Sequence, residues 1–185
     1  MGINGIRVTV VVVVVGFVPG LPWTAVSTGA DTTQSPGKAR EWPCRIVVQP
    51  PLLREVEKCW RSSASFRRQC EALADKRAVV ELRPGAETSF SLARTRITIA
   101  DGGVVVGRVE VPLSASTIEF IAHELEHILE RAEGVDLPRE SERTGSGVWR
   151  AVDGFETQRA TDMGRQVARE VGQSLRAGAD RSAKR

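Results

Sequence analysis

The sequence predicts an α+β fold, in which a small twisted β-sheet packs on one helix and a further helix follows at the C-terminal end. Two β-rich runs, residues 94–100 and 104–111, lie on either side of Asp101-Gly102-Gly103 and indicate a hairpin. Apolar residues recur at helical spacing over residues 117–133 and again over 155–175. The order is helices, then a small sheet, then two helices, which is typical of α+β domains.

The chain has 185 residues, enough for one domain of ordinary size, which we place at residues 44–176 after a flexible leader at 31–43. Pro50-Pro51 and Pro84-Gly85 mark the ends of two strands. The polar residues 177–185 are predicted to form a disordered tail. The shorter predicted elements are a strand at 45–49, helices at 52–60 and 65–76, a strand at 78–82, a polar loop at 134–146 and a short strand at 147–152.

Residues 1–30 differ in composition from the rest and are predicted to be a secretory signal peptide. Arg7 precedes an apolar run over residues 8–18, and small residues follow. The run has about 11 residues, whereas a helix that spans a bilayer needs about 20. An uncleaved membrane anchor is the alternative. We expect a secreted or periplasmic protein that begins near Thr28 or Asp31 and has no stable membrane insertion after cleavage.

The overall charge gives little support to nucleic-acid binding. The net charge is +3, and the lysines and arginines are mixed with acidic residues rather than gathered in a basic stripe. Hydrophobic residues make up 41% and charged residues 26%, the profile of a soluble globular protein.

Three cysteines follow the signal segment, at Cys44, Cys59 and Cys70. In an oxidising compartment one disulfide could form and leave one thiol. Cys59 and Cys70 flank a short serine-rich break and could be close in space, but the spacing leaves the pairing open. No CxxC pair is present, which argues against a zinc site made of cysteines.

The segment His123-Glu124-Leu125-Glu126-His127 carries the clearest chemical signal. Residues four apart lie on one face of a helix, so the imidazoles of His123 and His127 can reach one metal ion. Glu124 sits beside the first of them, where its carboxylate can take a proton from a zinc-activated water. This HExxH pattern predicts a site for one Zn²⁺ with Glu124 as general base. The alternative is a chance pair of histidines on a helix face, although these are the only two histidines in the chain.

A catalytic zinc normally takes three protein ligands, and with no third histidine the remaining ligand must be a carboxylate or something rarer. Glu130 and Glu133 occupy the Gly and His positions of the longer HExxHxxGxxH motif, which is therefore absent. Glu156 is the best candidate, because it lies in register with the apolar face of the final predicted helix. Asp162 falls on the polar face of that helix. Capping the start of the helix is the alternative role for Glu156.

The segment from His123 to Val171, with HELEH followed by Phe155-Glu156-Thr157-Gln158-Arg159-Ala160, resembles the zincin-like zinc metallopeptidases of the gluzincin type. The match is nearest to their small, single-domain, secreted bacterial members. The resemblance implies a zincin-like fold with Glu124 as general base. It also implies a rim strand that binds an extended peptide by β-addition, and residues 104–111, which precede the active helix, would be that strand.

The sequence departs from this family in one respect. Gluzincins usually place a Tyr or His where it stabilises the oxyanion of the tetrahedral intermediate, but this chain has no Tyr and no spare His. The arginines near enough in sequence to replace it are Arg143, Arg150 and Arg159.

We therefore predict an exported zinc metallopeptidase that hydrolyses peptide bonds in a peptide or protein substrate, with His123, His127 and Glu156 as the metal ligands. One alternative is a zincin-like metal-binding protein with little or no hydrolytic activity. Another is a non-enzymatic extracellular structural domain, in which the histidine spacing is a coincidence.

Overall fold

The computed structural model describes residues 9–11, 42, 44–85, 93–152 and 154–183. Most of the predicted signal peptide and leader, including the expected cleavage positions, lies outside the described residues. Among those that are described, no helix is both long and apolar enough to cross a membrane.

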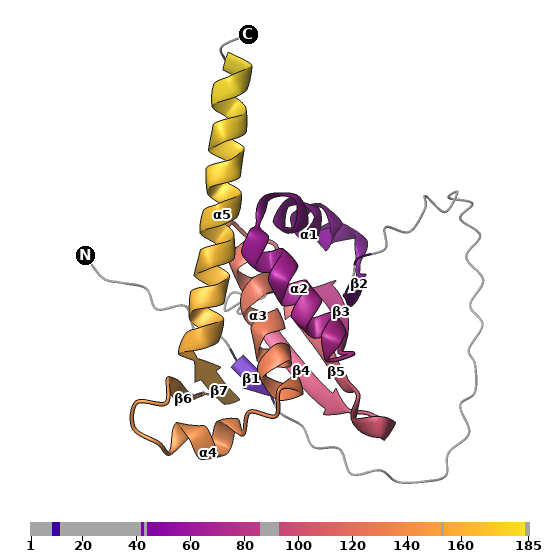
Figure 1. Cartoon of the computed structure of the whole chain (residues 1–185), viewed down its shortest axis with the longest axis vertical. Helices are drawn as coiled ribbons and strands as arrows, with labels where there is room; N and C mark the ends of the chain where they lie inside the picture. The colour runs from indigo at the N-terminus through magenta and orange to yellow at the C-terminus, as the bar shows by residue number, and fades with distance from the viewer. Residues whose placement is uncertain (1–8, 12–41, 43, 86–92, 153, 184–185) are drawn as a thin grey trace, which may run out of the picture.

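A five-stranded mixed sheet forms one layer of the structure (Figure 1). Among the described strands of this sheet, β4 and β5 pair in antiparallel fashion, through the predicted hairpin, and the other neighbouring strands are parallel. In spatial order the strands are β1 (Thr9–Val11), β4 (Arg94–Ile99), β5 (Val105–Val111), β3 (Val79–Pro84) and β2 (Arg45–Val48). The predicted α+β class is confirmed as a small mixed sheet with helices.

The helices and a second, two-stranded sheet complete the fold. Helix α3 packs on β5 and β4, and α5 lies along α3 and extends beyond the other elements (Figure 1). The bounds are α1 Pro50–Ser62, α2 Ala64–Asp75, the 3₁₀ turn Asp101–Gly103, α3 Thr117–Ala132, α4 Leu137–Ser141, β6 Val148–Ala151, β7 Gly154–Thr157 and α5 Gln158–Ala183.

Two glycines allow α3 to approach its neighbours closely. A Cβ at Gly107 on β5 would lie 2.2 Å from Cδ1 and 2.7 Å from Cγ1 of Ile128, so a larger residue here would require the Ile128 side chain to shift. A Cβ at Gly164 on α5 would lie 2.8 Å from the backbone oxygen of Glu119 and 3.2 Å from Cβ of His123. The helix that carries HELEH is therefore held between the sheet and α5.

Helix α5 also holds the start of α2. Ser63 caps α2 by accepting a hydrogen bond from the backbone N–H of Phe66, at 3.0 Å. Glu170 on α5 accepts hydrogen bonds from the Ser63 hydroxyl at 2.7 Å and from the backbone N–H and hydroxyl of Ser65 at 3.0 and 2.7 Å. A carboxylate at a helix N-terminus is also favoured by the helix dipole.

Four expectations about individual elements are wrong. The segment 134–146, expected to be a polar loop, contains helix α4. The final helix begins at Gln158 rather than at Phe155, because residues 154–157 pair with β6 as strand β7. It continues to Ala183, through most of the segment 177–185 that we expected to be a disordered tail. Strand β5, expected to bind a peptide, has β4 on one side and β3 on the other, so it has no free edge for β-addition.

Candidate metal centre

Helix α3 is buried on every side over residues 120–130. The sheet covers one face and α5 another, and α2 also contacts the helix. The burial encloses polar residues as well as apolar ones: His123, Glu124, Glu126, His127 and Glu130. Buried charged groups need partners, so the contacts of these five side chains define the site.

The two imidazoles face each other, and one carboxylate lies beside both. Nε2 of His123 is 3.0 Å from Nε2 of His127. Oε2 of Glu156 is 3.2 Å from Nε2 of His123 and 3.9 Å from Nε2 of His127. The three side chains are 7%, 0% and 6% exposed, in the order His123, His127, Glu156. Together they form a group that could hold a metal ion.

The donor set and its spacing fit a divalent metal with nitrogen and oxygen ligands. Two ligand atoms about 2.05 Å from a tetrahedral ion lie about 3.4 Å apart. The observed separations of 3.0, 3.2 and 3.9 Å bracket that value, so small side-chain shifts would complete the geometry. Oε1 of Glu156 and Oε1 of Glu124 are buried and have no hydrogen-bond partner among the described residues. Unpartnered buried carboxylate oxygens are costly, and a cation would satisfy Glu156.

Glu124 lies fully buried beside the pair of imidazoles. The hydroxyl of Thr95, on β4, donates a hydrogen bond to Oε2 of Glu124, and Oε1 is the oxygen left without a partner. Burial raises the pKa of the Glu124 carboxyl, against the opposing effects of the two imidazoles and the Thr95 hydroxyl. A carboxyl with a raised pKa and one unengaged oxygen has the properties of a general acid–base group.

His127 has a second partner on its other ring nitrogen. Nδ1 of His127 lies 3.0 Å from Oε2 of Glu130, and the hydroxyl of Thr157 donates to Oε1 of the same carboxylate at 2.7 Å. Burial alone would lower the pKa of His127, but the hydrogen bond to Glu130 and the neighbouring carboxylate charges outweigh it and raise the pKa.

Sequence reasoning did not assign roles to Thr95, Glu130 or Thr157. Glu130 stands three residues after His127, a spacing that places both side chains on one helix face. This contact could therefore have been predicted from the sequence. Thr95 and Thr157 reach the site from β4 and β7 through tertiary packing, and no pattern in the sequence indicates their contacts.

Glu156 reaches the histidines from a strand rather than from the first turn of a helix. It is on β7, opposite Trp149 of β6, and is 5% exposed. Capping the start of the final helix, the alternative role considered for Glu156, is wrong. The hydroxyl of Thr157 accepts a hydrogen bond from the backbone N–H of Ala160, at 2.9 Å, and so caps α5 instead.

The competing acidic residues have other partners. Asp162 is exposed and accepts a hydrogen bond from the Gln158 amide at 2.9 Å. Glu133 pairs with the guanidinium of Arg159, which lowers the pKa of the Glu133 carboxyl.

The three arginines considered for the oxyanion are engaged away from the cluster. Arg159 binds Glu126 through Nε at 2.6 Å in addition to Glu133, and so ties α5 to α3. Arg143 pairs with Glu140 at 2.9 Å. The guanidinium of Arg150 lies 5.6 Å from the ring centroid of Phe155. The recorded contacts of these arginines with described residues do not include His123, Glu124, His127 or Glu156, although Glu126, which Arg159 binds, lies on the same helix as the two histidines.

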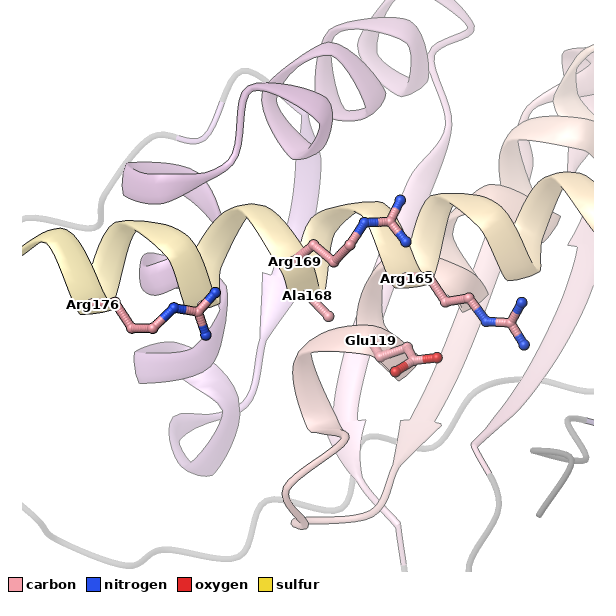
Figure 2. Close-up of a pocket in the computed structure, with 6 residues that line it drawn as sticks. Glu119, Arg165, Ala168, Arg169 and Arg176 are labelled. Carbon is pink, nitrogen blue, oxygen red and sulfur yellow. The ribbon is translucent and has the colours of Figure 1, made fainter. Parts of the chain in front are cut away.

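A separate hollow of about 360 Å³ lies where the first turn of α3 meets α5 (Figure 2). Glu119 contributes from α3, and three arginine side chains extend along α5 (Figure 2). The residues that line it are Glu119, Arg165, Ala168, Arg169, Gly172 and Arg176. None belongs to the cluster of His123, His127 and Glu156, so the hollow is distinct from the candidate metal centre.

Comparisons of the chain with models of protein families, with curated proteins and with solved structures find no match.

Proposed function

We propose that this protein is an exported zinc-dependent metallopeptidase of the zincin type. The proposal is supported chiefly by one observation, the three buried ligand atoms of His123, His127 and Glu156 that lie within 4.8 Å of one another, with the fully buried Glu124 next to His123 on the same helix. Two imidazoles, one carboxylate and an adjacent glutamate are the groups that zinc peptidases use. Export rests on the predicted signal peptide at residues 1–30.

When bound, zinc would lower the pKa of water and polarise a carbonyl. His123, His127 and Glu156 would hold the ion. Glu124 would accept the proton of the attacking water at Oε1 and return it to the leaving amine, while Thr95 holds the other carboxylate oxygen.

We further propose that an extended substrate pairs with the outer edge of β4. This strand carries Thr95, which contacts Glu124. Its outer edge is paired with β1, which also lies against β7, the strand of Glu156. An extended segment on that edge therefore runs past both the general base and a proposed ligand. Residues 9–11 fall within the predicted signal peptide, whose removal would free the edge.

A metal-binding protein with little or no hydrolytic activity is the second candidate. The observation in its favour is chemical: the chain has no Tyr and no third His, and the three candidate arginines have other partners. Transition-state stabilisation of the oxyanion is often a large contribution to peptidase rates. The presence of Glu124 favours a metallopeptidase over a protein that only binds metal, because metal binding alone does not require this carboxylate.

Metal analysis of the purified mature protein, together with digestion of a peptide library with and without a chelator, tests the proposal. We expect one zinc per chain and cleavage that stops with the chelator and returns with added Zn²⁺. Zinc without cleavage would favour the binding protein. Absence of any tight metal binding would contradict both.

A further inference from the structure

We infer that Glu130 is a positioning residue that holds His127 in its metal-binding tautomer and links it to the strand that carries Glu156. The inference deepens the proposed metal site and depends on it for its functional meaning. The supporting observation is that the two oxygens of the buried Glu130 carboxylate contact different parts of the site. Oε2 lies near His127, and Oε1 accepts a hydrogen bond from Thr157. Glu130 is 3% exposed, and its partners His127 and Thr157 are 0% and 2% exposed.

The hydrogen-bond directions follow from the donors available. The Thr157 hydroxyl accepts from the backbone N–H of Ala160, so its single proton is available for Oε1 of Glu130. An ionised carboxylate can only accept, and therefore Nδ1 of His127 must be the donor to Oε2. A neutral imidazole with its proton on Nδ1 has its lone pair on Nε2. That is the nitrogen that faces His123 and Glu156.

The same carboxylate ties the two halves of the site together. His127 belongs to α3, whereas Thr157 ends β7 and caps α5, immediately after Glu156. The chain of contacts runs from the imidazole through Glu130 to Thr157, and then to the start of α5. Glu130 thereby restrains the distance between His127 and Glu156, two ligands separated by a long stretch of sequence.

Loss of this carboxylate should weaken metal binding without removing any ligand. Glu130→Ala leaves Nδ1 of His127 and the Thr157 hydroxyl without partners, and we expect zinc affinity to fall about 10- to 100-fold. Glu130→Gln keeps an amide oxygen that can accept from Nδ1, so its loss should be smaller. Affinity is measured by competition for Zn²⁺ with a chromogenic chelator.

The threonines provide a matched pair. Thr157→Val removes the hydroxyl that contacts Glu130 and should weaken zinc binding, and Thr157→Ser should restore it. Thr161→Val is the control, because the Thr161 hydroxyl bonds only to the backbone oxygen of Thr157, at 3.0 Å, among the contacts recorded for it. Equal effects of the two valine variants would overturn the role of Thr157. If Glu130→Ala does not fold, Glu130→Gln and the threonine variants carry the same comparison.

A second measurement does not depend on metal or activity. With only two histidines in the chain, imidazole ¹⁵N spectra of the metal-free protein contain few signals. At alkaline pH we expect His127 to carry its proton on Nδ1 in the wild type, and this preference to be lost in Glu130→Ala. A proton on Nε2 in the wild type, or unchanged zinc affinity in Glu130→Ala, would overturn the inference. Failure of the wild type to bind zinc would instead contradict the proposed function, and the tautomer would still decide the role of Glu130.

Discussion

The hydroxyl of Thr95 donates a hydrogen bond to Oε2 of Glu124, and so joins β4 of the sheet to the proposed general base on α3. Both side chains are 0% exposed. The bond leaves Oε1 of Glu124 as the oxygen with no partner. Thr95 thus selects which carboxylate oxygen remains available for chemistry.

Thr95→Val should lower peptidase kcat/KM by roughly 10- to 100-fold, because a hydrogen bond to a charged group contributes about 1.5–3 kcal/mol. Zinc affinity should stay unchanged, since no proposed ligand contacts Thr95. Thr98→Val on the same strand is the control, because the Thr98 hydroxyl bonds weakly to the backbone oxygen of Val106, at 3.4 Å. Steady-state kinetics on one cleaved peptide would compare Thr95→Val with Thr98→Val. Equal rates in the two variants would contradict the role of Thr95 in supporting Glu124.

Glu124→Gln should retain zinc and lose peptidase activity. The amide preserves the shape of the side chain but cannot accept the proton of the attacking water. Metal content and peptide cleavage are measured on the same preparation. Undiminished cleavage would show that the activity belongs to another residue or another protein.

Glu156→Ala should weaken zinc binding by orders of magnitude, because it removes one of three ligands. Asp162→Ala should leave zinc binding nearly unchanged, since Asp162 is exposed and bonds to Gln158. Chelator competition compares the two variants. Similar affinity in Glu156→Ala and wild type would leave His123 and His127 as the only assigned ligands.

Glu170→Gln should destabilise the fold at neutral pH. Burial disfavours the charged carboxylate, but its hydrogen bonds from Ser63, Gln166 and Ser65 outweigh this and lower the pKa of Glu170 to about 2, from 4.5. The folded state therefore binds the proton less tightly than the unfolded state, and the stabilisation is present above pH 4.5. It is lost as pH falls toward about 2.

Thermal unfolding of the wild type and Glu170→Gln across this pH range measures the effect. The difference in stability should be largest at neutral pH and shrink on acidification. Glu71→Gln, at an exposed position of α2, should show little difference at any pH. A gap between wild type and Glu170→Gln that is independent of pH would mean that the charge of Glu170 is not what stabilises the start of α2.

Oxidation should link Cys44 to Cys70 and leave Cys59 as a thiol. Cys44 and Cys70 are both buried free thiols, and they lie close enough for each to shift the pKa of the other, lowering that of Cys44 and raising that of Cys70. Burial raises the pKa of Cys59 to about 12, so few thiolates form there. Incubation with oxidised glutathione, which accepts the two electrons, followed by alkylation and mass spectrometry identifies the pair. A bridge that contains Cys59 would contradict this assignment.

The HELEH segment is an example of a feature that the local sequence predicts. Its spacing placed two imidazoles on one helix face, and the structure brings His123 and His127 together because four residues make about one helical turn. The hairpin around residues 101–103 was likewise predictable, since glycines there adopt positive φ angles of 78° and 77°. These features depend on residues close together in the chain.

Glu156 was placed near the histidines for a reason that was partly wrong. Its register with the apolar face of the final helix indicated burial, and the residue is buried, but it lies on β7. The switch from strand to helix at residue 157 depends on pairing with β6 and on the Thr157 cap. Pairing between strands involves partners that the local pattern does not contain.

The sequence by itself determined which helix bears the histidines, where Glu124 stands beside them, and that an acidic residue must complete any three-ligand site. Only the tertiary structure decided that Glu156 is the residue that lies within 3.2 and 3.9 Å of the two imidazoles. It likewise decided that Thr95 and Thr157 reach the same cluster, and that β4 rather than β5 lies toward the edge of the sheet. The physical reason is that helical spacing is set by the backbone of a few neighbouring residues, whereas contacts between α3, β4 and β7 arise only when the whole core packs.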